Sequence, residues 1–291
     1  MNGRLRDSWE ALRYGPLLRG ASTHPLAGRL YEKLVAGIEW RADPNRRAVA
    51  SARIADTLQC SQQQAQAIFR ACLGSEAREE ADTAWVARRG IALADILPHR
   101  PGLPSEGRGS IFATLHLGSP ILTFLYLREV LGLPLRAIGR PLDDDNPLSA
   151  AKRAWGSAKV GWVSRSSGTT FINTDARGII QAREELLAGR SIYAAIDVPA
   201  DLASRAMALE IHGRSFSFAA GIPRLAQLTG AEILPVIGLH RAEGFRVEFG
   251  APISCPTQEE TQKALAAWLS QTLCSYPDEW WLWPYAEEVA K

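Results

Sequence analysis

The sequence predicts an α/β protein, with a mostly parallel sheet flanked by helices and a helical N-terminal region. Two observations lead to this prediction. Residues 1 to about 98 show helical patterns, and after a Pro- and Gly-rich stretch at 98–109 short apolar runs alternate with amphipathic segments. Strands that alternate with helices favour a parallel sheet covered on both faces. We therefore expect a helical region at 1–104 and an α/β core at 105–291, packed as one compact unit.

The composition is that of an ordinary globular protein, with 46% hydrophobic and 22% charged residues among 291. A net charge of +2 gives no support for nucleic acid as a partner. The chain has no run of about 18 uncharged apolar residues and no hydrophobic signal region at its N-terminus. Its four cysteines lack the spacing of a metal site or a disulfide framework. These features predict a cytoplasmic protein, soluble or peripheral on the inner face of the cytoplasmic membrane, with no metal.

Within the helical region, leucines or isoleucine recur every four residues from Leu26 to Ile38, which predicts an amphipathic helix with one apolar stripe. Ser61 and Gln64 form a capping-box pattern that starts another helix, and Gly74 is its expected end. A further helical segment follows at 76–97.

The first residues are basic and contain aromatic side chains, with Arg4, Arg6, Arg13 and Arg19 beside Trp9. Two interpretations stay open for them: a solvated amphipathic helix, or contact with an anionic membrane surface.

The α/β region divides into short apolar runs and longer amphipathic segments. Strands are expected at 110–116, 133–139, 160–164, 191–197, 232–240 and 245–253. Helices are expected at 120–132, 146–158, 175–189, 221–230 and 257–276. The segment lengths and the Gly, Pro, Ser and Asp residues at their ends decide between the two types.

Polar residues stand at the ends of four expected strands, where open α/β sheets bind ligands. His116 closes the first strand, Arg140 follows the second, and Asp197 and His240 close two later ones. Each could be an ordinary polar strand end, but four together predict a site. The chain has no glycine-rich motif for a dinucleotide or phosphate. No nucleophile elbow surrounds Ser119, so a hydrolase with Ser119 and His116 is the weaker alternative.

Five segments, in this order, carry a resemblance to a known family: "ATLHLGSPI", "RPLDDDNPL", "LLAGRSIYAAIDVP", "HGRSFSFAAGIPRLAQLTGAEILPVIGLHR" and "YPDEWWLWPY". Over residues 105–286 the chain resembles the bacterial late acyltransferases of lipid A biosynthesis, in the lysophospholipid-acyltransferase-like superfamily. The resemblance implies an acyltransferase-like fold. It also implies transfer of an acyl group from an acyl-carrier protein or acyl-CoA thioester to a hydroxyl or amine. The thioester would be a co-substrate, and no further cofactor is expected.

The family signature is His-x-x-x-x-Asp/Glu, in which the acidic residue orients the histidine that acts as general base. Here the histidine is His116, but the fifth residue after it is Ile121. Asp197 could supply the carboxylate from another strand end, or an amine acceptor could need less base assistance. Alternatively, the chain could have lost catalysis and kept lipid or acyl-carrier binding.

The resemblance also implies substrate contacts. Arg140 corresponds to a position that binds polar head groups or phosphates, and an arginine suits bidentate recognition of an anion. Ser119, Arg214 and Ser217 are the other expected substrate contacts; the last two stand where the family has a loop that enters a helix lining the acyl pocket.

Partner surfaces are suggested by two further features. Exposed arginines offer a docking patch for an acidic acyl-carrier protein, or are simply solvated: Arg88, Arg89, Arg100 and Arg108. The tryptophan-rich segment at 277–285 is expected to be a docked tail, with a membrane-interface belt as the alternative. The family's N-terminal transmembrane anchor has no counterpart here, which favours a smaller acceptor than lipid A.

Overall fold

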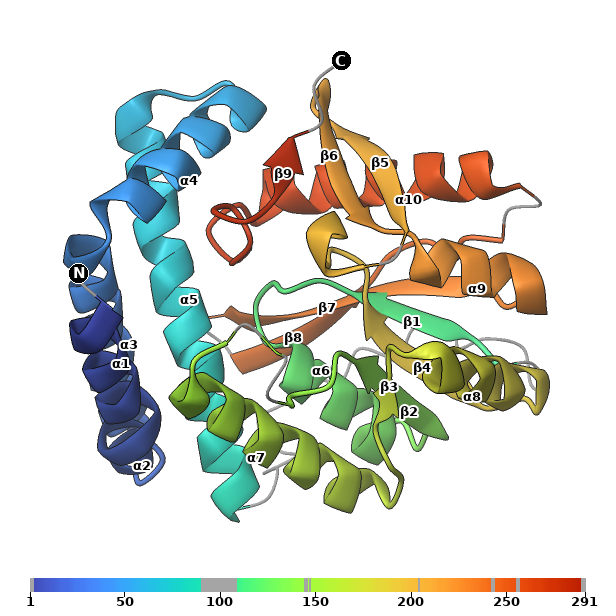
Figure 1. Cartoon of the computed structure of the whole chain (residues 1–291), viewed down its shortest axis with the longest axis horizontal. Helices are drawn as coiled ribbons and strands as arrows, with labels where there is room; N and C mark the ends of the chain where they lie inside the picture. The colour runs from blue at the N-terminus through green and yellow to red at the C-terminus, as the bar shows by residue number, and fades with distance from the viewer. Residues whose placement is uncertain are drawn as a thin grey trace.

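The computed structural model describes residues 3–89, 109–143, 146, 148–203, 205–241, 244–254 and 257–288. Its centre is a six-stranded sheet in the order β3-β2-β4-β1-β7-β8, in which the first five strands are parallel and β8 runs antiparallel to β7. Helices lie on both faces, and a bundle of N-terminal helices stands beside the sheet (Figure 1). The α/β fold with a mostly parallel sheet and a helical N-terminal region is therefore confirmed. The expected boundary at residues 104–105 lies outside the described residues.

The elements have the following bounds. The strands are β1 (Ile111–Thr114), β2 (Leu135–Gly139), β3 (Ile172–Asn173), β4 (Ser191–Ala195), β5 (Ala206–Ile211), β6 (Arg214–Ala219), β7 (Ile233–Arg241), β8 (Gly244–Phe249) and β9 (Glu287–Glu288). The α-helices are α1 (Gly3–Leu12), α2 (Leu18–Ala21), α3 (Pro25–Ala42), α4 (Pro44–Leu58), α5 (Gln62–Arg89), α6 (Pro120–Leu125), α7 (Ala150–Ser167), α8 (Ala176–Leu187), α9 (Gly221–Thr229) and α10 (Gln258–Ser275). Short π-helical turns follow α1 and α6, at Arg13–Leu17 and Tyr126–Val130.

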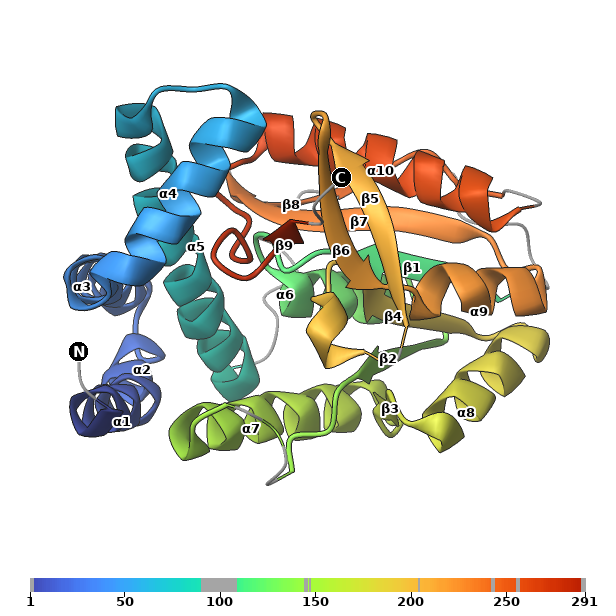
Figure 2. The ribbon, with the colours of Figure 1, turned by 45° about the horizontal axis from the view of Figure 1, so that its top comes forward.

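The central sheet is buried on both faces because successive strand residues point to opposite sides. In β1, Ile111 and Ala113 join a core with residues of α8, α9 and α10, whereas Phe112 joins a second core with α6 and α7. Figure 2 shows these helices on the two sides of the sheet. Every β1 residue is fully or almost fully buried, so only groups beyond the strand end reach solvent.

A small second sheet, β5-β6-β9, lies beside the main one. The sequence analysis expected a loop entering a helix here, and that prediction missed the β5–β6 hairpin. Buried Met207 and Leu209 alternate with exposed residues along β5, a strand period. His212 and Gly213 both have positive φ angles, 50° and 75°, as the turn of a tight hairpin requires.

The strand expected at 160–164 is wrong, because this segment lies inside α7. A five-residue apolar run cannot be distinguished from a helix by its pattern alone. The ends of α7 settle the matter: the Ser149 side chain accepts from the Lys152 N–H at 3.2 Å, and Gly168 is left-handed at φ 63°.

The start of α5 is correct, but its expected end is not. Ser61 and Gln64 form the capping box, each side chain accepting from the other residue's backbone N–H at 2.9 and 3.3 Å. The helix then continues through Gly74 to Arg89, joining two segments that the sequence analysis separated. Gly74 is not among the glycines with positive φ, the conformation that ends a helix at glycine.

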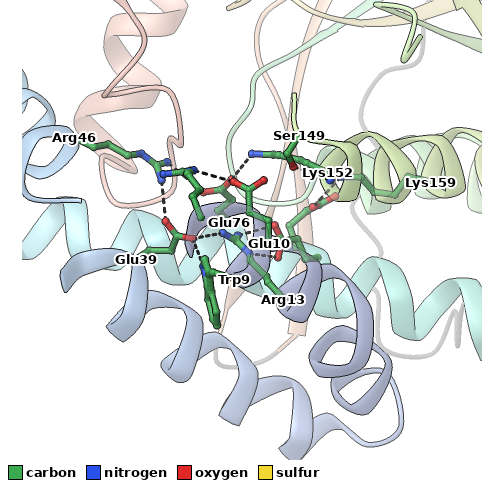
Figure 3. A network of polar contacts seen from close by, with 12 residues as sticks. Trp9, Glu10, Arg13, Glu39, Arg46, Glu76, Ser149, Lys152 and Lys159 are labelled. Atoms are coloured by element: carbon green, nitrogen blue, oxygen red, sulfur yellow. Dashed lines mark hydrogen bonds and ion pairs between the residues drawn. The ribbon is translucent and has the colours of Figure 1, made fainter. Parts of the chain in front are cut away.

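The N-terminal helices enclose a buried polar network, drawn in Figure 3. Arg13 is only 3% exposed, and its three guanidinium nitrogens donate to Glu80 (2.7 and 3.1 Å) and Glu39 (3.0 Å). Trp9 donates to Glu39 at 2.7 Å. The structure therefore fits the amphipathic interpretation of α1, with Trp9 on its buried face and most of its other residues exposed. Trp9 and Arg13 are not available for contact with a membrane surface, because both side chains form interior hydrogen bonds.

Within the described residues, no helix has the length and apolar composition needed to cross a membrane.

Candidate active site

His116 lies in a bulge at the carboxyl end of β1. Ala113 is paired with Pro235 of β7 and Gly118 with Gly238, so four intervening residues face two on β7. The extra length displaces His116 from the sheet, as bulges do beside functional sites. Gly118 has φ 61°, and a Cβ there would collide with the Gly238 carbonyl oxygen, so only glycine permits this path.

The structure brings His116 and Asp197 together. Asp197 stands just beyond β4, the strand next to β1, and its side chain is fully buried. Its Oδ1 lies 2.9 Å from His116 Nδ1, while its Oδ2 accepts from the His116 backbone N–H at 2.7 Å and from Trp280 Nε1 at 2.8 Å. The expected contact is thus present, and three donors hold the buried Asp197 carboxylate in place.

These contacts determine the protonation of the imidazole. An ionised carboxylate only accepts hydrogen bonds, so Nδ1 carries a proton toward Asp197 and the neutral ring leaves Nε2 as a base. Burial lowers the pKa of His116, but the charge and hydrogen bond of Asp197 raise it more, so the pKa lies above 6.5. The side chain is 39% exposed, which makes the ring accessible to a substrate.

The C-terminal tail closes the site from the other side. Trp280 and Trp283 are fully buried, which confirms the docked tail. The backbone N–H of Trp281 donates to the His116 carbonyl at 3.0 Å, and the Trp281 ring lies edge-on to the imidazole at 6.4 Å between centroids. The tail therefore holds both the backbone of His116 and the carboxylate that orients its ring.

Helix α5 adds carboxylates to the same region. Glu79, almost fully buried, lies 3.4 Å from Lys159 Nζ of α7 and accepts from Thr83 at 3.0 Å. Burial raises the pKa of Glu79, with opposition from Lys159, and both charges act on His116. One turn further along α5, Asp82 Oδ2 lies 2.9 Å from Nε2 of His240, which is the penultimate residue of β7 rather than its end.

The position of the missing motif carboxylate is apolar. Ile121 is the second residue of α6 and packs, partly buried, against the core formed with α7. A carboxylate there would need to leave this packing, because burial without a partner disfavours its charged form. The carboxylate that contacts His116 comes from β4 instead.

Ser119 is fully buried, and within the described residues its hydroxyl has no hydrogen-bond partner, His116 included. The serine–histidine contact that a hydrolase needs is therefore absent from the structure. The hydroxyl is also closed off from any substrate at the exposed face of His116.

The other expected substrate contacts lie on other elements than His116. Arg140 is exposed at the end of β2, and β4 lies between that strand and β1. Arg214 begins β6 and pairs with Asp56 of α4 at 3.4 Å. Ser217 lies half-buried within the β5–β6 hairpin, opposite Ala208.

A separate pocket of about 480 Å³ lies at the opposite edge of the sheet, near the amino ends of β2 and β4. None of the expected site residues lines it; its wall consists of Arg128, Pro134, Leu135, Arg136, Thr169, Thr170, Glu185 and Arg190. No group of three or more side chains suited to hold a metal ion is present among the described residues. Of the arginines expected to dock a carrier protein, Arg88 and Arg89 are exposed at the end of α5, whereas Arg100 and Arg108 lie outside the described residues.

Several residues of this site escaped the sequence analysis. Trp280, Glu79 and Lys159 reach it from the tail, α5 and α7, which are far from His116 in sequence. The false strand at 160–164 hid that Lys159 belongs to a helix. His240 was recognised as a strand end, but its partner Asp82 was not.

No family model matches this chain, and no curated protein matches it.

Proposed function

We propose that this chain is an acyltransferase with the fold of the lipid A late acyltransferases. It transfers an acyl group from an acyl-carrier protein or acyl-CoA thioester to a hydroxyl or amine acceptor. His116 is the general base, and Asp197 orients it.

One observation carries the proposal: the 2.9 Å contact between His116 Nδ1 and Asp197 Oδ1. A histidine–carboxylate contact like that of the family is thus formed although the motif is broken at Ile121. This supports the relocated carboxylate over the other two explanations of the broken motif. A buried carboxylate that fixes a partly exposed imidazole ring is the arrangement that general base catalysis needs.

The reaction follows from this arrangement. Nε2 removes the proton of the acceptor as its oxygen or nitrogen attacks the thioester carbonyl carbon. The tetrahedral intermediate then collapses, the carbon–sulfur bond breaks, and the thiolate takes the proton back from the imidazolium. Asp197 stabilises the imidazolium between these steps without itself being protonated.

The test compares the wild type with His116→Ala, using acyl-carrier-protein and acyl-CoA donors and mass spectrometry of the product. We expect His116→Ala to lower the rate by about 10³, within the usual range for a general base, while donor binding stays nearly unchanged. The matched control is His212→Asn at the exposed hairpin turn, where asparagine tolerates the positive φ, and this variant keeps full activity. Unchanged turnover in His116→Ala would eliminate the proposal. Donor binding by the wild type without any product would favour a binding-only protein.

A further inference from the structure

Helix α3 presents an apolar and basic face to solvent. Its exposed residues are Pro25, Leu26, Arg29, Leu30, Lys33, Leu34 and Arg41. Leu26, Leu30 and Leu34 leave 61%, 68% and 45% of their surface in water. The three leucines of the predicted stripe therefore point outward, although such stripes usually face a core, and only Ile38 at its end packs against the core of the helical region.

The opposite face of α3 already has its partners. Tyr31 and Val35 are buried in the core of the helical region, together with residues of α5. Figures 1 and 2 both place α3 at the edge of the molecule farthest from β1 and β4. No described segment is thus required to cover the leucines, and the helix is stable without a further partner.

The charges on the two faces are sorted by sign. Glu32 is half-buried and pairs with Arg78 at 2.6 Å, and Glu39 is buried against Arg13. In the part of the chain that the structure describes, Arg29 and Lys33 form no ion pair. The outward face consequently carries leucines flanked by positive charge, with no exposed carboxylate of α3 to offset it.

We propose that this face of α3 docks on an anionic lipid surface. A helix that lies in a membrane interface buries an apolar stripe near the acyl chains and directs Lys and Arg to the headgroups. Anionic lipids add attraction for each basic side chain near the surface. The proposal stands apart from the acyl-transfer proposal, because it concerns binding alone.

Two other occupants fit less well. In a two-fold dimer the same face meets itself, so Arg29 and Lys33 of one copy would lie near those of the other. A protein partner would need about 800 Å² of complementary surface per side, whereas α3 offers one convex ridge of three leucines. A lipid surface requires neither opposite charge on a copy nor a matching groove.

The experiment measures co-sedimentation of the full chain with phosphatidylcholine vesicles, with and without phosphatidylglycerol. We expect binding to the mixed vesicles and at least about tenfold weaker binding to phosphatidylcholine alone. The triple variant Leu26→Ser, Leu30→Ser, Leu34→Ser is expected to weaken binding by about a hundredfold, because it removes the exposed apolar area that the lipid surface would cover. Arg29→Glu with Lys33→Glu is expected to abolish the preference for phosphatidylglycerol.

The matched control removes equally exposed apolar side chains from α8, on the far side of the sheet: Ile180→Ser with Leu187→Ser, which are 57% and 56% exposed. Its vesicle binding stays at the wild-type level. Equal binding to both vesicle types, or wild-type binding by the leucine variant, would overturn the proposal. A wild-type dimer that the leucine variant turns into a monomer, seen by light scattering, would assign the face to a second copy instead.

Discussion

In two clusters of the described residues, around Arg13 and around Asp197, buried carboxylates accept several hydrogen bonds, but the two clusters differ in how far they are exposed. Around Arg13, all three guanidinium nitrogens are bonded and 3% of the residue is exposed. Around Asp197, the carboxylate is as fully bonded, but the imidazole that contacts it is 39% exposed. The first cluster is buried, whereas the second leaves part of an imidazole ring in contact with solvent.

The comparison shows that a buried, hydrogen-bonded carboxylate can serve stability in one place and the orientation of a reactive group in another. The buried ion-pair network leaves almost no surface for a substrate to reach, so its contribution is to hold the turn that follows α1 against α3 and α5. It adds little net stability relative to apolar packing, yet it is costly to break. In the cluster around Asp197, the hydrogen bonds orient one base, His116. Activity should thus respond to changes at Asp197, and stability to changes at Arg13.

The largest effect is expected at Asp197. Asp197→Asn should lower the acyl-transfer rate by about 10³, as much as His116→Ala, because in triads the amide favours the wrong tautomer of the histidine. Steady-state kinetics with circular dichroism of the same samples will measure it. The control is Asp201→Asn in the exposed turn four residues later, which keeps its activity.

A double variant tests whether His116 and Asp197 act as one unit. If they do, His116→Ala with Asp197→Asn loses little more activity than His116→Ala alone, because the effects are not additive. A loss below about tenfold in the folded Asp197→Asn protein would mean that Asp197 has a structural role only.

Arg13 should affect stability without affecting chemistry. Arg13→Met leaves two buried carboxylates, Glu39 and Glu80, without their cation, and should lower the free energy of unfolding by about 3–5 kcal/mol. Urea unfolding measures this, and the rate per folded molecule should be unchanged. Arg19→Met, at an exposed position, is expected to stay within about 0.5 kcal/mol of the wild type. A rate loss in folded Arg13→Met would show that the two clusters are coupled.

The sequence could predict part of the cluster around Asp197, namely which residues end the strands, but not the contact between them. The sequence analysis placed His116 and Asp197 at strand ends because clear apolar runs predict β1 and β4. It expected them in one site because the carboxyl ends of parallel strands lie along the same edge of the sheet. Strand order brings the two residues together: β4 lies beside β1 although 81 residues separate the partners. A sequence motif of fixed spacing cannot describe that contact.

The rest depended on packing that local patterns do not encode. Trp280 reaches Asp197 because the tail folds back over β1, and no periodicity indicates the direction of a tail. The leucine stripe of α3 is evident in the sequence, but only the structure shows that α3 buries the opposite face, with Tyr31 and Val35, and exposes the leucines. Arg13 and Trp9 were visible as a basic, aromatic start, and their burial follows from acidic partners on α3 and α5.

A smaller effect on activity is expected at Trp280. Trp280→Phe removes one donor from the Asp197 carboxylate while it keeps a large apolar ring, and bonds to charged groups contribute about 1.5–3 kcal/mol. We expect the rate to fall by about tenfold, measured as kcat with saturating donor. Trp283→Phe is the matched control: it is equally buried in the same tail, but its indole donates to the Pro277 carbonyl at 2.8 Å. Equal loss in both variants would assign the effect to tail packing.

The smallest effect is a shift of the pH profile. Because Asp197 raises the pKa of His116 above 6.5, the acid limb of kcat/KM should have its midpoint above that value, since only the neutral ring accepts a proton. Trp280→Phe should move the limb to higher pH, because it leaves more of the carboxylate's charge to the imidazole, and Asp197→Asn should move it to lower pH. The raised pKa also means that protonated His116 stabilises the fold. That contribution to the free energy of unfolding is complete below the unfolded-state pKa of about 6.5 and is lost as the pH rises through the folded-state pKa. An NMR titration of the imidazole gives the same pKa directly. A pKa at or below 6.5 would mean that Asp197 does not stabilise protonated His116, and would contradict the role proposed for this carboxylate.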